Sequence, residues 1–440
     1  MLLLKDARIL QFMPPEVQAG MDILIEGNKI VRVGRNLAPE FPNARTMELA
    51  GNLASPGMVC SHNHFYSALA RGILADIKPS TDFVSTLQNL WWRLDRAIDE
   101  EILHYSGLIG AIEAIRAGTT AVIDHHASPN LIGGSLKILK EAFEKVGLRG
   151  ILCYEVTDRN GRSGMRAGVD ENIAFAEMVA KETKSAGRNL LQAAIGAHAS
   201  FTLGDEALSL LSEAVKATGT GIHIHVAEDR YDSSASHHLH QSDIMRRLEA
   251  GNILNGKAIC AHGVHLTDSD IEILNRHDCF LVHNARSNMN NGVGYAEKLR
   301  AVRNVALGTD GIGSDMFEEM KFAYFKHKDA RGAYWPADFL GFLHNGAVLL
   351  ERYFSGSFQR IEAGSAADLV IHDYRNPTPL VAENIAGHFA FGLSSSSVKT
   401  VIVNGAVVYE DRRFPFDLNP LYEKANKAAK SLWKRMDELS

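Results

Sequence analysis

Short apolar runs alternate with longer amphipathic stretches between about residues 55 and 360. Eight runs have the length of a buried strand, and they cover residues 57–62, 119–126, 149–155, 192–198, 221–228, 258–262, 279–283 and 305–310. Stretches between the runs, such as 100–118, 135–147, 205–219 and 268–277, carry apolar residues at the i, i+3, i+4 spacing of a half-buried helix. Strands alternating with helices predict a parallel sheet, and eight such units predict a closed (β/α)8 TIM-like barrel.

The two ends of the chain follow a different pattern. Residues 22–34 place alternating apolar runs on either side of Gly27-Asn28, and residues 398–409 do the same around Asn404-Gly405. Both patterns predict β-hairpins, and 367–373 predicts a further strand. Because an isolated hairpin is marginally stable in water, we expect the terminal strands to pair with one another. We therefore predict an α/β chain with a composite β-sandwich domain from 1–55 plus 361–440 and a barrel domain from 56–360.

Every one of the eight apolar runs ends on His, Asp or Glu, and the carboxyl ends of barrel strands surround one mouth where active sites are built. His62 and His64 alternate at the end of the first run, so both imidazoles face one side. His223 and His225 alternate in the fifth run, and Asp310 closes the eighth. Three imidazoles and a carboxylate predict a site for a divalent ion such as zinc or iron.

Other residues have competing interpretations. A single histidine at a strand end, such as His125, His198 or His283, is more often a hydrogen-bonded core residue than a ligand. The polar segment 237–240 is interpreted as a solvated surface cluster or a substrate-gating element. Residues 76–98 are longer than a usual βα loop and contain Trp91 and Trp92, which indicates either a lid over the mouth or ordinary packing.

Composition narrows the function classes. A formal net charge of −6 gives no attraction for nucleic acid or for an anionic membrane. No apolar run approaches the roughly 18 residues that span a bilayer. Four cysteines without a CxxC pair favour a reducing compartment, so we predict a cytoplasmic location. Nineteen histidines are an unusual number and direct attention to metal chemistry.

The segments PGMVCSHNHFY, HIHVAED, AHG and GTDGIGSD occur in this order across the predicted barrel. Together they resemble the amidohydrolase superfamily, in the branch of guanine deaminase, other aminohydrolases of cyclic amidines and the triazine chlorohydrolases. The resemblance covers essentially the full length. It implies metal ligation by His62, His64, His225 and Asp310, with Zn²⁺ as the expected ion and Fe²⁺ as the other candidate. It also implies a homodimer or higher homo-oligomer.

The same resemblance implies roles for residues around the metal. Glu228 would be the acid/base for a substrate ring nitrogen, and His262, together with Asp310, would steer the attacking water and its proton. The expected substrate-binding residues are His198, His283, Ser287 and Asn288, to which we add Trp92, His126 and Glu155 as residues that set the pocket width. This chain departs from the family pattern at Asn284-Ala285 and Asn290-Asn291. The fourth run, QAAIGAH, contains no lysine that could bridge two metals, which favours a single ion.

The predicted function is metal-dependent hydrolytic deamination of an amino-substituted N-heterocycle of purine, pyrimidine, pterin or triazine type. Two alternatives remain open at this point. A chlorohydrolase would release chloride from a similar ring at the same site. A catalytically silent barrel would bind the metal and act as a sensor or an assembly partner.

Overall fold

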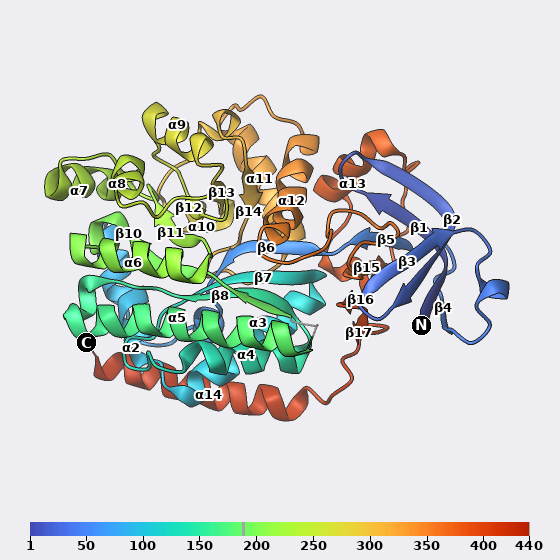
Figure 1. Ribbon diagram of the computed structural model, residues 1–440, viewed down its shortest axis with the longest axis horizontal. Coiled ribbons are helices and arrows are strands. Elements are labelled where there is room, and N and C mark those ends of the chain that lie inside the picture. The colour runs from blue at the N-terminus through green and yellow to red at the C-terminus, as the bar shows by residue number, and fades with distance from the viewer. Residues whose placement is uncertain (187–189, 440) are drawn as a thin grey trace.

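The structure is a computed structural model that describes residues 1–186 and 190–439. A barrel of parallel strands surrounded by helices lies beside a smaller sheet built from both chain ends (Figure 1). The predicted α/β class, the (β/α)8 barrel and the pairing of the terminal strands are confirmed. The strands of the barrel coincide with the eight apolar runs, so the hydrophobic pattern located them correctly.

The barrel strands are β6 Met58–Asn63, β7 Thr119–His126, β8 Arg149–Tyr154, β9 Leu191–Ala193, β10 Ile195–Ala199, β11 Ile222–Val226, β12 Ile259–His262, β13 Phe280–His283 and β14 Val305–Leu307. The fourth apolar run is divided into β9 and β10, and the backbone NH of Ala194 between them still donates to Leu152 O at 3.1 Å. The strands pair in parallel from β6 to β9 and from β10 to β14. A bridge between Asn63 and Asp310 closes the ring.

Helices follow the strands around the outside of the barrel. They are α3 Glu100–Arg116, α4 Ser135–Val146, α5 Gly161–Ala186, α6 Asp205–Thr218, α7 Arg230–His240, α8 Ile244–Ala250, α9 Asp268–Arg276, α10 Ala285–Asn290, α11 Met316–Asp329 and α12 Pro336–Glu351. The four stretches with helical spacing became α3, α4, α6 and α9. Helix α4 ends at Gly147 and α6 at Gly219, both in the left-handed conformation that suits glycine at a helix end.

The terminal sheet contains β1 Leu2–Gln11, β2 Glu16–Glu26, β3 Lys29–Gly34, β4 Arg45–Glu48, β5 Leu53–Pro56, β15 Leu369–His372, β16 Val398–Val403 and β17 Ala406–Tyr409. The predicted hairpins are β2–β3 and β16–β17. Asn404 (φ 52°) and Gly405 (φ 77°) both have the positive φ that a type I′ turn requires. Strand β5 pairs antiparallel with β15, which joins the two chain ends into one sheet.

A buried ion pair connects the sheet to the barrel. Arg149 at the start of β8 donates through Nε and Nη2 to the two carboxylate oxygens of Asp368, at 2.7 and 3.0 Å. Helix α13 Ile385–Phe391 packs against the barrel helices α11 and α12, and α14 Asn419–Glu438 lies along the barrel against α3 (Figure 1). The border between the two domains therefore stays a prediction.

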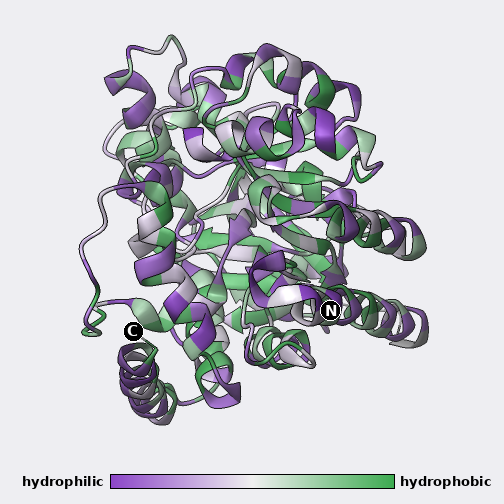
Figure 2. Cartoon of the chain, turned by 90° about the vertical axis from the view of Figure 1, so that its left-hand side faces the viewer, coloured by the Kyte–Doolittle hydropathy of each residue, from purple (hydrophilic) through white to green (hydrophobic). Residues whose placement is uncertain are grey.

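Hydrophobic residues are concentrated on the central strands, and hydrophilic residues lie along the outer faces of the helices (Figure 2). This distribution places the core between the strands and their surrounding helices. Among the described residues, no helix is both long enough and apolar enough to cross a membrane.

Candidate active site

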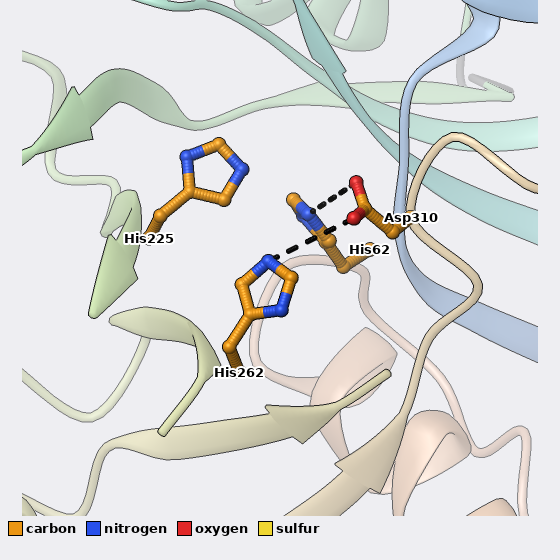
Figure 3. Close-up of side chains that lie close together, drawn as sticks. All are labelled: His62, His225, His262 and Asp310. Carbon is orange, nitrogen blue, oxygen red and sulfur yellow. Dashed lines mark ion pairs between the residues drawn. The ribbon is translucent and has the colours of Figure 1, made fainter. Parts of the chain in front are cut away.

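Three histidines and one aspartate converge at the carboxyl end of the barrel. His64 Nε2 lies 2.8 Å from Asp310 Oδ1 and 3.3 Å from His225 Nε2. His62 Nε2 lies 3.5 Å from the same Asp310 oxygen. Figure 3 shows His62, His225 and Asp310 facing a common centre, with His262 beside them. All are buried or nearly buried, so the donor atoms form one enclosed cluster.

Each of the three histidines is oriented by a contact to its other ring nitrogen. His64 Nδ1 donates to the carbonyl oxygen of His125 at 2.5 Å, and His225 Nδ1 donates to that of His198 at 2.9 Å. His62 Nδ1 lies 2.8 Å from His223 Nε2. With Nδ1 engaged, each Nε2 faces the centre, which is the arrangement that orients histidine ligands around metals.

Two residues of the site have a strained backbone. Asp310 (φ 53°) and His262 (φ 75°) lie in the left-handed region that residues other than glycine rarely adopt. Close packing of β14 against β6 holds Asp310 in place, because its NH donates to His62 O at 3.0 Å. This approach requires Gly308, where an added Cβ would lie 2.8 Å from His62 N and 2.5 Å from Asn284 Oδ1. The barrel closure therefore brings His62 and Asp310 together.

The electrostatics of the cluster favour one positive charge at its centre. Burial lowers the pKa of His62 to about 3 and lowers that of His225 well below its ordinary value. Burial also works against a charge on His64, but the hydrogen bond and charge of Asp310 outweigh it and raise the pKa of His64 to about 9. Burial would raise the pKa of Asp310, yet the close approach of His62 and His64 holds it well below its usual range.

The donor set fits a divalent ion. His62 Nε2 and His262 Nε2 are buried and have no hydrogen-bond partner within the described part of the chain. A buried polar atom without a partner is costly unless something else satisfies it. Neutral imidazoles and a carboxylate are the ligands that zinc and similar ions prefer.

Glu228 and His262 lie at one side of this cluster. His262 Nε2 is 3.6 Å from Glu228 Oε2 and 3.9 Å from Asp310 Oδ2. His262 Nδ1 donates to Asn288 Oδ1 at 2.9 Å, and Asn291 Nδ2 donates to Glu228 Oε1 at 3.2 Å. Burial raises the pKa of Glu228 above its ordinary value. A carboxyl whose pKa is raised can hold a proton nearer to neutral pH and give it to a bound molecule.

The segment 76–98 folds over the mouth of the barrel. It contains α1 Phe83–Thr86, a π-helical turn at Leu87–Trp91 and α2 Trp92–Ala97. The cavity beneath it has a volume of about 50 Å³. Its lining consists of His64, Tyr66, Phe83, Leu87, Trp91, Trp92, Asp95, Glu155, His198, Ala199, Phe201, His225, Glu228, Asp232, Asn291, Asp310 and Gly311. The segment thus covers the site, as a lid would, and contributes both tryptophans to the cavity wall.

Charged groups on the lid side of the cavity are paired with one another. Arg159 Nη2 lies 2.8 Å from Asp95 Oδ2 and 3.7 Å from Glu155 Oε1. The Arg159 guanidinium also stacks on the Trp92 ring, with Cζ 4.5 Å from the ring centroid. On the inner side, Glu155 Oε2 lies 3.2 Å from His125 Nδ1. These contacts attach α2 of the lid to the carboxyl end of β8.

The cavity therefore has two halves of different construction. We call His62, His64, His225, His262, Asp310 and Glu228 the histidine half. We call Trp92, Asp95, Glu155, Arg159 and His198 the lid half.

The predicted site residues fall into three groups. The four predicted ligands lie close together, but the donor atoms within 4.8 Å of one another belong to His62, His225, His262 and Asp310, so the choice between His64 and His262 stays a prediction. Trp92, Glu155, His198 and Glu228 line the cavity. Ser287 and Asn288 lie behind the lining, where Ser287 donates to Asp310 and Asn288 contacts His262. His126 and His283 lie outside the lining as well. His126 Nε2 is 2.7 Å from Ser128 Oγ, and both ring nitrogens of the buried His283 lack partners within the described part of the chain.

Sequence reasoning missed Asp95 and Arg159 as members of the site. Asp95 follows Trp92 by three residues, the spacing of neighbours on one helix face, and this signal could have placed it beside the tryptophan. Arg159 follows Glu155 by four residues and lies in the short 3-10 helix Asp158–Asn160, which is too short to leave a period in the sequence. Segment 237–240 is surface-exposed at His237 and His238, in agreement with a solvated cluster.

The fold and the site together define a metal-dependent hydrolase built on a TIM-like barrel. A family model of the amidohydrolase family matches residues 53–408. The chain belongs to the amidohydrolase family.

Individual known proteins agree with this assignment. The chain is 31% identical over 403 residues to a 5-methylthioadenosine/S-adenosylhomocysteine deaminase of Thermococcus sibiricus, covering 88% of this chain and 89% of the relative. Its fold is similar to that of a zinc-containing adenosine deaminase of Xanthomonas campestris, with a TM-score of 0.83, 21% identity and 98% of each chain covered. It is also similar to the zinc complex of atrazine chlorohydrolase TrzN of Arthrobacter aurescens TC1, with a TM-score of 0.81, 21% identity and coverage of 98% and 100%.

The predictions of family, fold and reaction class are confirmed at this level. The chain is a hydrolase of the amidohydrolase family, and the curated relative is named as a deaminase.

Proposed function

We propose that the protein is a metal-dependent aminohydrolase that removes an exocyclic amino group from an N-heterocycle and releases ammonia. The observation that carries this proposal is the convergence of His62 Nε2, His64 Nε2 and His225 Nε2 on the carboxylate of Asp310. The adjacent Glu228 and His262 supply the two proton-handling groups that such a reaction needs.

His62, His64, His225 and Asp310 would hold one divalent ion, with Zn²⁺ as the expected metal. When bound, such an ion lowers the pKa of water to about 7 and so supplies a nucleophile at neutral pH. The proposal is supported by the unpartnered Nε2 atom of His62 and by the zinc in the two similar solved structures.

The residues around the ligands divide the proton transfers between them. Glu228, which is buried and has a raised pKa, protonates the ring nitrogen next to the amino-bearing carbon while a water oxygen adds to that carbon. His262 and Asp310 orient the water and accept its proton. The C–N bond then breaks, and the amino group leaves as ammonia once it has received a proton. The overall change is one water consumed and one ammonia released for each amino group replaced by oxygen.

Substitution of Glu228 tests this assignment. Glu228→Gln keeps the size of the side chain but removes the proton, so we expect turnover to fall by at least ~100-fold while metal content is unchanged. Asp229→Asn is the matched control, because Asp229 is the adjacent carboxylate and serves as the N-cap of α7. Turnover is measured as ammonia release from adenosine, 5′-methylthioadenosine, guanine, cytosine, a pterin and an aminotriazine. Unchanged turnover in Glu228→Gln would remove Glu228 from the mechanism.

Chloride release from a chlorotriazine is the second candidate reaction, and the similarity to the fold of atrazine chlorohydrolase is the reason to test it. A chloride leaves without being protonated, so the buried acid Glu228 favours an amine as the leaving group. Chloride release together with no ammonia from any amine would establish the alternative. A metal-loaded protein that releases neither product would support the silent barrel.

The predicted cytoplasmic location and the predicted homodimer or higher oligomer complete the proposal. Size-exclusion chromatography with light scattering tests the oligomer directly. The expected ligand is a small heterocycle, with no nucleic acid and no membrane as partner.

A further inference from the structure

The lid half of the cavity contains a charge arrangement that the proposed reaction does not use. We propose that the enzyme selects amino-heterocycles without an anionic group and rejects phosphorylated ones, and that Asp95 and Arg159 are the specificity-determining pair. This inference rests on the proposed function and names the substrate class for the same site.

Acidic residues dominate the cavity lining. The carboxyl groups come from Asp95, Glu155, Glu228, Asp232 and Asp310, whereas none of the described lining residues is a lysine or an arginine. One divalent ion at the histidine half would offset part of this charge, but only close to the ligands. A phosphate or carboxylate reaching the lid half would meet Asp95 and Glu155 instead. Burial raises the pKa of Asp95 to about 7, so Glu155 carries the firmer negative charge of the two. Like charges in a poorly solvated pocket repel strongly.

Arg159 is close to this part of the cavity, but its charge is already committed. It lies 2.8 Å from Asp95 and 3.7 Å from Glu155, and its side chain is only 12% exposed. Only Nη2 makes these contacts, and Nε of Arg159 has no hydrogen-bond partner within the described residues. An anion that reached this guanidinium would still have to share it with the carboxylate of Asp95, whose side chain is 2% exposed, so the pair disfavours anions.

The stacking of Arg159 on Trp92 further holds the guanidinium in its position beside Asp95. The guanidinium Cζ lies 4.5 Å from the Trp92 ring centroid, within the range of a cation–π contact. The same tryptophan lines the cavity together with Trp91 and Phe201. Aromatic walls and carboxylates suit a flat ring that is neutral or positively charged, and they offer nothing to a phosphate.

A comparison of matched ligands tests the inference. The probe pairs are adenosine with adenosine 5′-monophosphate, guanosine with its 5′-monophosphate, and cytidine with its 5′-monophosphate. Both kcat/KM for ammonia release and equilibrium binding to the metal-loaded protein are measured. For at least one pair, we expect the nucleoside to be preferred over its phosphate by about 100-fold or more. Equal or better use of the phosphates, or binding of none of the nucleosides, would overturn the inference.

Two substitutions should change the preference for the nucleoside in opposite directions, which distinguishes a role of the charge pair from a general disruption of the cavity. Asp95→Asn removes one negative charge and releases Arg159, so the preference for the nucleoside should fall by about 10-fold. Arg159→Met leaves Asp95 unopposed, so the preference should rise. Asp99→Asn is the control, since this residue directly follows the segment and pairs with Arg435 on the outside. A preference that stays unchanged in both variants, or moves in the same direction in both, would contradict the assignment.

The two proposals fail in different ways. If the nucleosides bind selectively but release no ammonia, the proposed deamination fails while the selectivity inference stands. If ammonia is released equally from nucleosides and nucleotides, the deamination stands and the selectivity inference fails.

Discussion

The two halves of the cavity are both buried and rich in charged groups, yet they treat charge in opposite ways. In the histidine half, nitrogen lone pairs face a common centre and His62 Nε2 has no hydrogen-bond partner within the described residues. In the lid half, Asp95 is paired with Arg159 at 2.8 Å, and Arg159 is stacked on Trp92. One half is incomplete without an added cation, whereas the other carries a permanent cation of its own.

This difference indicates that the histidine half serves the chemistry and the lid half serves ligand selection. Donor atoms without partners in a rigid barrel mouth are suited to binding an ion, because burying them without a partner is unfavourable until an ion binds. In the lid half, Asp95 Oδ1, Arg159 Nε and Trp92 Nε1 also have no hydrogen-bond partner within the described residues, but the two opposite charges are paired with each other. Such paired charges are suited to selection, because a ligand must not disturb them. Substitutions in the histidine half should therefore change turnover or metal binding, and substitutions in the lid half should change which ligand is accepted.

Removal of the metal should have the largest effect. Without a divalent ion the nucleophile is water with a pKa near 16, so we expect turnover to fall by more than ~1,000-fold after chelation. Addition of Zn²⁺ should restore it. Metal content is measured by atomic emission on the same samples. Full turnover in protein with less than about 5% bound metal would mean that the histidine half is not the source of the nucleophile.

His262→Gln should have the next largest effect. Because His262 handles the proton of the attacking water, kcat should fall by about 10²- to 10⁴-fold with metal content unchanged. His265→Gln is the control, since this nearby histidine hydrogen-bonds to Val293 O at 2.8 Å and does not line the cavity. Loss of the metal in His262→Gln would instead make His262 a ligand, an outcome that its place in the same cluster makes worth testing.

His223→Leu tests whether His223 orients the His62 ring for metal binding. His223 Nε2 contacts His62 Nδ1 at 2.8 Å and orients that ring from behind. Loss of such a supporting contact weakens metal affinity by about 10- to 100-fold. Competition with a chelator of known affinity measures this change. If the affinity is the same as in the unmodified protein, the orientation of His62 does not depend on His223.

Trp92→Leu should have the smallest effect, and it should change KM and not kcat. Loss of the aromatic wall and of the cation–π contact should raise KM by about 3- to 10-fold and leave kcat within about twofold. Trp335→Leu provides the comparison, because Trp335 is 68% exposed and lies outside the lining. A large fall in kcat would contradict the division between the halves, since it would place Trp92 in the chemistry.

The histidine half was predictable because regular structure positions its residues. His62 and His64 follow the two-residue period of a strand, and Asp310 follows the last strand, so the carboxyl ends of the barrel bring them together. The choice between His223 and His225 could not be made from alternation alone. Both residues lie on the same face of β11, but His225 is nearer the carboxyl end and meets His64, whereas His223 contacts Nδ1 of His62 from behind.

The lid half was only partly predictable, for the opposite reason. Trp92 and Glu155 attracted attention by residue type and position, but the partner of Asp95 lies in a different loop. Contacts between loops depend on tertiary packing and leave no period in the sequence. His283 ends a barrel strand as predicted, but it is not among the described residues that line the cavity, so its role in substrate binding stays a prediction.

The central claim is that His62, His64, His225 and Asp310 hold one metal ion, and X-ray absorption at the zinc edge tests it most directly. The account predicts nitrogen and oxygen scatterers at about 2.0–2.2 Å with the outer-shell pattern of three imidazoles, reduced to two in His225→Ala. Sulfur scattering at about 2.3 Å, or a spectrum that His225→Ala leaves unchanged, would contradict it.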